Sequence, residues 1–132
     1  MRLSSVGYKL LDGEAAYLDS LPDLRCHELG CEVRLNFHDA PPMFVTWADD
    51  PCQFCVGLFD ESQFKGVYES RDLSGIAPWR ELIGHEITLT FLDTAHQVLR
   101  VGDDARAVFL SSMDDTGGWQ ADVVRVTDRC PE

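Results

Sequence analysis

Two cysteines separated by two residues form the chemical motif of the chain that is easiest to recognise. The segment Cys52-Gln53-Phe54-Cys55 has the ligand spacing of a zinc site and also that of a redox dithiol. A structural zinc needs four nitrogen or sulfur ligands, which a second pair of cysteines would have to complete. The glycine of a zinc knuckle is missing here, and Cys55 lies in a strand-like run. We therefore expect packed thiols, no stoichiometric zinc and no cofactor; the weaker alternative is a metal site formed by Cys26, Cys31, Cys52 and Cys55.

The four histidines are scattered along the chain, at His27, His38, His85 and His96. Asp39 follows His38 and Glu86 follows His85, but neighbouring side chains on a strand point to opposite faces. Neither pair is therefore a base with its orienting group. We interpret the histidines as surface or turn residues, and we assign no catalytic residue. A cysteine–histidine nucleophile would require tertiary contacts.

Adjacent acidic residues occur four times, each time in an expected turn. None of the four pairs has the alternating carboxylates and fixed glycine of a calcium loop. Acidic turns that gather at one end of a sheet around an exposed tryptophan would form a docking rim for a basic protein. Tryptophans more often belong to the core, which is the alternative for Trp47, Trp79 and Trp119. The residues predicted to bind a partner are Asp49, Asp50, Asp103, Asp104, Asp114, Asp115 and Trp119.

The familiar catalytic and nucleotide-binding motifs are missing from the sequence. We find no glycine-rich phosphate loop, no nucleophile elbow, no zinc-protease helix, no dinucleotide fingerprint and no EF-hand loop. These absences leave no reaction class that the sequence favours, and the chain resembles no family closely enough to be assigned to it.

The charge balance excludes two classes of partner. The 132 residues include 11 Lys and Arg against 23 Asp and Glu, a formal net charge of −12. Such a field repels nucleic-acid phosphates and anionic membrane surfaces. It attracts basic proteins and speeds their encounter. The alternative reading is that the charge serves only solubility.

The cysteine content and the start of the sequence indicate a cytoplasmic protein. Five cysteines are an odd number in a chain large enough to fold without disulfides, which suits a reducing compartment. No apolar stretch has the length of a signal peptide core or of a membrane span.

Local patterns predict two helices and up to seven strands. Apolar spacing, with Asp12 as the N-cap and Pro22 as the stop, predicts a helix over 12–21. Pro78 and Gly84 delimit a second helix over 78–83. Alternating or β-branched runs predict strands over 31–38, 43–48, 53–59, 85–92, 97–101, 106–111 and 119–126.

These elements predict a single α+β domain spanning residues 1–132. Short turns between the last four strands indicate an antiparallel meander over 85–126. Leu89, Phe91, Val101 and Phe109 are its expected core residues. The helices are expected on one face or end of the sheet. A strongly bent sheet and a partial barrel are alternatives that remain open for the same strands.

Three functions remain open at this point. The first is a non-enzymatic binding protein with an acidic surface for a basic protein partner, of the inhibitor or immunity type. The second is a small enzyme or small-ligand binder with a pocket in a curved sheet. The third is an assembly subunit that dimerises through a sheet edge, and the oligomeric state itself is not predicted.

Overall fold

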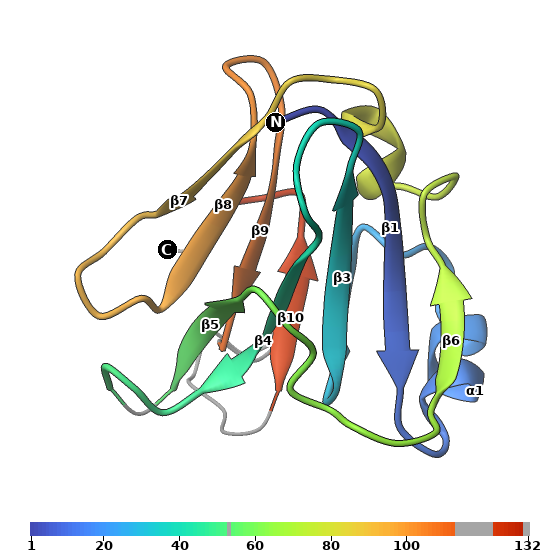
Figure 1. Cartoon of the computed structure of the whole chain (residues 1–132). Coiled ribbons are helices and arrows are strands. Elements are labelled where there is room, and N and C mark those ends of the chain that lie inside the picture. Colours follow the sequence, from blue (N-terminus) through green and yellow to red (C-terminus); the bar gives the residue numbers. More distant parts are fainter. Residues whose placement is uncertain (53, 113–122, 131–132) are drawn as a thin grey trace.

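Two antiparallel five-stranded sheets pack face to face in the computed structural model, which describes residues 1–52, 54–112 and 123–130 (Figure 1). The first sheet has the strand order β5-β4-β3-β1-β6. Its strands are β1 (Leu3–Leu10), β3 (Glu32–Phe37), β4 (Met43–Ala48), β5 (Cys55–Phe59) and β6 (Glu69–Asp72).

The second sheet has the strand order β2-β10-β9-β8-β7. Its strands are β2 (Cys26–Leu29), β7 (Thr88–Phe91), β8 (Val98–Gly102), β9 (Ala107–Ser111) and β10 (Val124–Thr127). Two helical segments complete the described structure: the α-helix α1 (Glu14–Ser20) and the 3₁₀-helix η1 (Trp79–Leu82). Neither segment is long and apolar enough to cross a membrane, and the described residues contain no other helix.

Alternate residues of both sheets meet in one hydrophobic core. Val33 and Leu35 project from the first sheet, and Leu99 and Leu110 from the second; all four are fully buried. Burying a leucine side chain contributes about 1.5–3 kcal/mol, so this layer is the main source of stability. Because directly opposed residues on antiparallel strands share a face, the register of each sheet also decides which residues face outward.

The predicted C-terminal meander is confirmed over the described residues, with one error in its core; positions 119–122 of its last predicted strand lie outside them. β7, β8, β9 and β10 are consecutive antiparallel neighbours. Val101 is buried, and Leu89 and Phe91 are partly buried against the core. The assignment of Phe109 was wrong, because it lies opposite Arg100 on the outer face of the sheet while its neighbours in β9 point inward.

The protein is richer in sheet than the predicted α+β layout. The described residues form ten strands in two separate sheets that do not close into a barrel, and η1 is a single 3₁₀ turn in place of the second helix. β1 escaped prediction because an irregularity between Leu3 and Ser5 shifts its register and interrupts the alternation. β6 escaped because its four residues are all polar.

The helix α1 forms close to its predicted place but with a different start. Its N-cap is Gly13, whose φ of 87° is left-handed, and not the expected Asp12. The Glu14 carboxylate instead accepts the backbone N–H groups of Leu11 and Gly30 at 2.8 and 2.6 Å. Glu14 thereby ties the start of α1 to the loop that follows β2.

Candidate functional site

Two of the acidic turns singled out in the sequence lie at opposite ends of the sandwich. The hydroxyl of Ser112, just after β9, donates to the carbonyl of Cys55 at the start of β5, at 3.1 Å. The turn with Asp49 and Asp50 directly precedes β5, so it lies at this end. The turn between β8 and β9 lies at the other end of β9 (Figure 1). These two turns therefore do not form one docking rim.

The remaining predicted partner residues differ in their surroundings. Asp49, Asp50 and Asp104 are exposed. Asp103 is half-buried, and its Oδ1 accepts the backbone N–H groups of Ala105 and Arg106, both at 2.9 Å. These hydrogen bonds hold the pKa of Asp103 below its usual range. Asp103 is thus an organising residue of its turn. Asp114, Asp115 and Trp119 lie outside the described residues.

The cysteines are not gathered into a metal site in the part of the chain that the structure describes, where no three His, Cys, Asp or Glu side chains are arranged to hold a metal ion. Cys52 donates to the carbonyl of Ala95 at 3.2 Å, and burial together with the neighbouring Cys55 raises its pKa. Burial raises the pKa of Cys31 to about 11. A raised pKa keeps a thiol protonated, and the thiolate is the nucleophile, so these environments do not activate the cysteines.

One histidine is buried, contrary to the expectation of surface histidines. His27 of β2 is 1% exposed, because its position in β2 points into the core. Its Nδ1 donates to the Leu24 carbonyl at 2.7 Å, which leaves Nε2 to accept the hydroxyl of Tyr8 at 2.7 Å. The indole N–H of Trp79 donates to the same hydroxyl at 2.6 Å. We call Tyr8, His27 and Trp79 the core triad; it links both sheets and η1.

The core triad is neutral and closed to solvent. Burial lowers the pKa of His27 to about 4 and raises that of Tyr8 above its usual range. All three side chains are 0–1% exposed, and each polar atom has a partner. The arrangement stabilises the fold and offers no access to a substrate.

The other histidines and tryptophans have structural surroundings. His38 is exposed, and the ring of His96 stacks on Phe91 with centroids 3.9 Å apart. His85 Nε2 lies 3.3 Å from a guanidinium nitrogen of Arg106. Trp47 is half-buried and donates to the Gly30 carbonyl at 2.9 Å. Trp47 and Trp79 therefore belong to the core and its margin.

A second buried polar cluster lies beneath the loop between β5 and β6. Glu32 is 1% exposed although it occupies an outward position of β3. It accepts the Ser62 hydroxyl and lies 3.5 Å from Lys9 Nζ, which donates to the Phe64 carbonyl at 2.7 Å. We call Lys9, Glu32 and Ser62 the loop clamp, because they hold the loop across the outer face of the first sheet.

Acidic residues gather where α1 lies beside β6 (Figure 1). Four exposed carboxylates lie here, and we call them together the acidic edge: Asp12, Asp19, Glu69 and Asp72. Its arginine, Arg71, is paired with Asp19 at 2.8 Å. Asp12 and Glu69 make no hydrogen bond or ion pair with any described residue, so their charges are available to a partner.

A groove with apolar margins runs along the acidic edge. It has a volume of about 360 Å³ and lies between residues 10–12 and 65–69. Val67 at its rim is 102% exposed, and Leu11 on the opposite side is 38% exposed. Lys65, the cation of the groove, lies 4.0 Å from Glu61. We call this feature the edge groove. Carboxylates without an ion pair and exposed apolar side chains lie next to each other along it.

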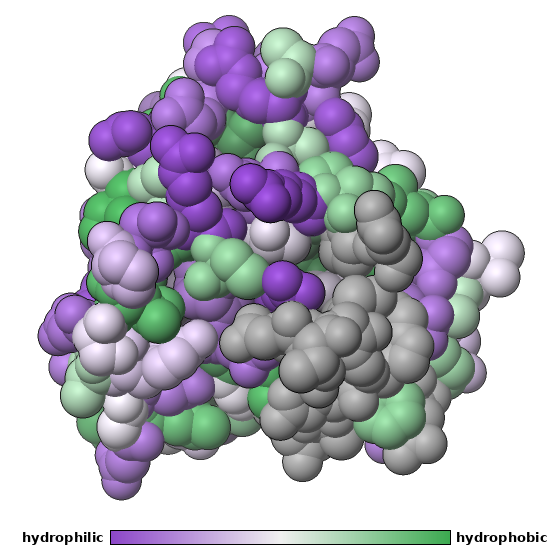
Figure 2. Space-filling view, turned by 180° about the vertical axis from the view of Figure 1, so that it is seen from behind, coloured by the Kyte–Doolittle hydropathy of each residue, from purple (hydrophilic) through white to green (hydrophobic). Residues whose placement is uncertain are grey.

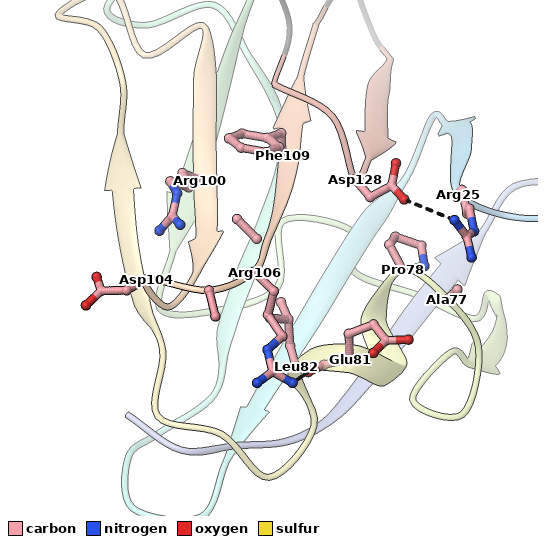
Figure 3. Close-up of a pocket in the computed structure, with 12 residues that line it drawn as sticks. Arg25, Ala77, Pro78, Glu81, Leu82, Arg100, Asp104, Arg106, Phe109 and Asp128 are labelled. Carbon is pink, nitrogen blue, oxygen red and sulfur yellow. Dashed lines mark hydrogen bonds and ion pairs between the residues drawn. The ribbon is translucent and has the colours of Figure 1, made fainter.

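A larger groove lies between η1 and the outer face of the second sheet (Figure 3). It has a volume of about 520 Å³, and we call it the η1 groove. Its lining includes the apolar Pro78, Leu82 and Phe109. Three arginines and three acidic residues also line it: Arg25, Arg100, Arg106, Glu81, Asp104 and Asp128.

Sequence reasoning missed both grooves. The segment 60–68 contained one sequence signal for an exposed apolar contact. Val67 follows Lys65-Gly66 and belongs to no helical or strand pattern of apolar residues. Glu69 lines the edge groove because of the register of β1 with β6, in which it lies opposite Leu10. No local pattern brings Arg25, β8 and η1 together, so the η1 groove had no signal in the sequence.

Comparison with known proteins gives no further guidance on function. No family model, no curated protein and no solved structure matches the chain. The functional argument therefore depends on the geometry of this protein alone.

Proposed function

We propose that this protein is a non-enzymatic binding protein that recognises a basic protein partner through its acidic edge. The observation that carries the proposal is the coincidence of unpaired carboxylates and exposed apolar side chains along one groove. An inhibitor or immunity-type protein for a cationic target is the concrete form of this function.

The charges of the acidic edge suit long-range attraction of a basic surface. Asp12 and Glu69 form no ion pair or hydrogen bond with a described residue, although Arg71 is near enough to Glu69 to interact with it electrostatically. Asp72 stays ionised because hydrogen bonds from Ser74 lower its pKa. A net charge of −12 adds a field that acts beyond the groove. Charges of this kind mainly accelerate association and select the sign of the partner.

The apolar rim supplies the short-range part of binding. A fully exposed Val67 and a half-exposed Leu11 offer apolar area that a partner side chain would remove from water. Each 100 Å² of apolar area buried contributes about 2.5 kcal/mol before the costs of association. A basic segment with at least one apolar residue fits this combination.

A titration with a short peptide of alternating lysine and leucine tests the proposal. Backbone amide NMR signals of residues 10–12 and 65–69 are expected to shift, and Asp12→Asn with Glu69→Gln is expected to weaken binding about tenfold. Both substituted side chains keep their shape and make no described hydrogen bond, so the fold should be unaffected.

The matched control is Asp49→Asn with Asp50→Asn, which changes the net charge equally at a distant turn. If binding depends only on net charge, the two double variants weaken the peptide alike, and the proposal fails. If the control alone weakens binding, the predicted turn at residues 49–50 is the docking surface. Capture from a lysate of the native host with both variants then identifies the natural partner.

A further inference from the structure

The η1 groove differs from the rest of the surface in its charge. Its three arginines balance its three acidic residues, whereas the whole chain carries twelve excess negative charges. Three of the nine arginines of the sequence line this one groove. The face seen in Figure 2 is largely hydrophilic in its upper half and has only small separate apolar patches. In this concave, charge-balanced region the local charges do not add to the repulsion that the net charge of the chain exerts on a small anion.

The two arginines on the β8–β9 side are held in place by the turn between these strands. The Asp103 carbonyl accepts an N–H from the Arg100 guanidinium. The Asp103 carboxylate lies 4.0 Å from Arg106 Nε, and Arg106 also donates to the Glu81 carbonyl at 3.2 Å. One residue thus orients both guanidinium groups before any ligand arrives, which lowers the cost of binding.

Arg100 keeps donors available for a ligand. A guanidinium has five N–H donors, and the described structure gives Arg100 this one hydrogen bond. Its remaining donors can form the paired hydrogen bonds that arginine makes with a carboxylate or phosphate. Arg25 is engaged with Asp128 at 4.0 Å on the opposite side of the groove (Figure 3).

The floor beside Arg100 is apolar and aromatic. Phe109 lies directly opposite Arg100 on the neighbouring strand and shares its outward face. Its ring is half-buried, and the buried Leu82 and Pro78 pack beneath the η1 side of the groove. An aromatic ring next to an arginine lets one ligand stack on the flat ring and pair with the positive guanidinium at the same time.

We propose that the η1 groove binds a small organic anion that carries an aromatic ring. Arg100 holds its carboxylate or phosphate group, and Phe109 packs against its ring. The volume of about 520 Å³ lies within the range of small-molecule sites. In Figure 3 the Asp104 carboxylate points away from Phe109, and the Asp128 carboxylate points to Arg25, so neither acid covers the Phe109 ring.

This site is independent of the acidic edge. The residues of the acidic edge do not line the η1 groove, and those of the η1 groove do not line the edge groove. A variant at Asp12 and Glu69 therefore leaves anion binding unchanged, and failure of one proposal does not decide the other.

The test uses four probes in amide NMR titrations of the whole chain: phenyl phosphate, benzoate, neutral benzyl alcohol and inorganic phosphate. Phenyl phosphate and benzoate are expected to shift signals of residues 105–109, and both more strongly than benzyl alcohol. Arg100→Gln is expected to raise the Kd for phenyl phosphate about tenfold. Phe109→Leu is expected to weaken both aromatic anions and to leave inorganic phosphate unchanged.

The matched control is Arg34→Gln. Arg34 also lies over an aromatic ring, that of Phe44 at 5.4 Å, on the outer face of the other sheet, and it lines none of the grooves described above. Equal losses in Arg34→Gln and Arg100→Gln would show non-specific attraction and overturn the proposal. The absence of shifts at residues 105–109 with either aromatic anion up to about 10 mM would also overturn it.

Discussion

The core triad and the loop clamp are both buried polar clusters, yet they stabilise the protein in different ways. The core triad is a neutral chain of hydrogen bonds between the sheets, in which Trp79 donates to Tyr8 and Tyr8 to His27. The loop clamp pairs two charges, Lys9 and Glu32, on the outside of one sheet. Glu32 is 1% exposed, but the Lys9 side chain is 31% exposed.

The comparison shows what each environment demands of a polar group. Between the sheets no water replaces a lost partner, so each atom of the core triad must be paired within the protein. At the loop clamp, solvent reaches the ammonium group of Lys9. The pair is therefore only partly desolvated, and burying the carboxylate costs less free energy. Variants should therefore cost more in the core triad than in the loop clamp.

Tyr8→Phe is expected to have the largest effect. It leaves the Trp79 N–H and the His27 Nε2 without a partner, at about 1–3 kcal/mol for each buried group. The total loss of unfolding free energy should be on the order of 2–5 kcal/mol, measured by urea denaturation at neutral pH. Tyr68→Phe is the control, since the Tyr68 hydroxyl makes no hydrogen bond with a described residue and its loss should cost less than about 0.5 kcal/mol. Similar losses in the two variants would refute the role of the core triad.

The pH dependence of stability should be the next largest effect. His27 has a pKa of about 4 in the folded protein against 6.5 for the free side chain, because burial disfavours its charged form. The unfolded chain therefore binds the proton first as the pH falls, and stability is lost from about pH 6.5 down to about 4. The 2.5-unit difference corresponds to about 3 kcal/mol in total.

Urea denaturation between pH 7 and pH 4 measures this slope. Carboxylates with a lowered pKa, such as those of Asp72 and Asp103, lose their contribution only below their ordinary value of 3.8, outside this window. His27→Gln should flatten the slope, whereas His38→Gln, at an exposed position, should leave it unchanged. An unchanged slope in His27→Gln would contradict the assignment.

Lys9→Met is expected to have the smallest effect of the three. It leaves Glu32 with the Ser62 hydroxyl and the Gln63 N–H but without a cation. We expect a loss of about 1–2 kcal/mol, less than the 3–5 kcal/mol of a fully buried broken pair, because Lys9 is partly exposed. Lys65→Met removes an exposed pair and should cost almost nothing. A loss in Lys9→Met larger than in Tyr8→Phe would reverse the comparison between the two clusters.

Local patterns in the sequence predicted the strands that have regular alternation and short turns. β4 occupies the predicted residues, and β3, β5, β8 and β9 lie within or close to theirs. The meander followed from its turns, because consecutive strands joined by a few residues must pair antiparallel. The acidic character was also readable directly, since net charge needs no coordinates.

The burial of particular residues was decided only by tertiary structure. Glu32 stands at an outward position of an alternating strand, yet the loop 60–68 covers it. Phe109 faces out because its neighbours in β9, Val108 and Leu110, both face the core, and side chains alternate along a strand. His27 is buried because β2 joins the far edge of the second sheet, beside β10, a contact between residues about a hundred positions apart.

The sequence by itself thus determined the charge, the antiparallel character and most of the strands, all of which depend on residues close together in the chain. Tertiary structure alone decided the division into two sheets, the core triad and both grooves. The physical reason is that strand register across long sequence separations sets which side chains share a face, and a shift of one residue reverses every side chain of a strand. The acidic edge and the η1 groove exist only because β1 pairs with β6 and because η1 lies across a groove from β8 and β9.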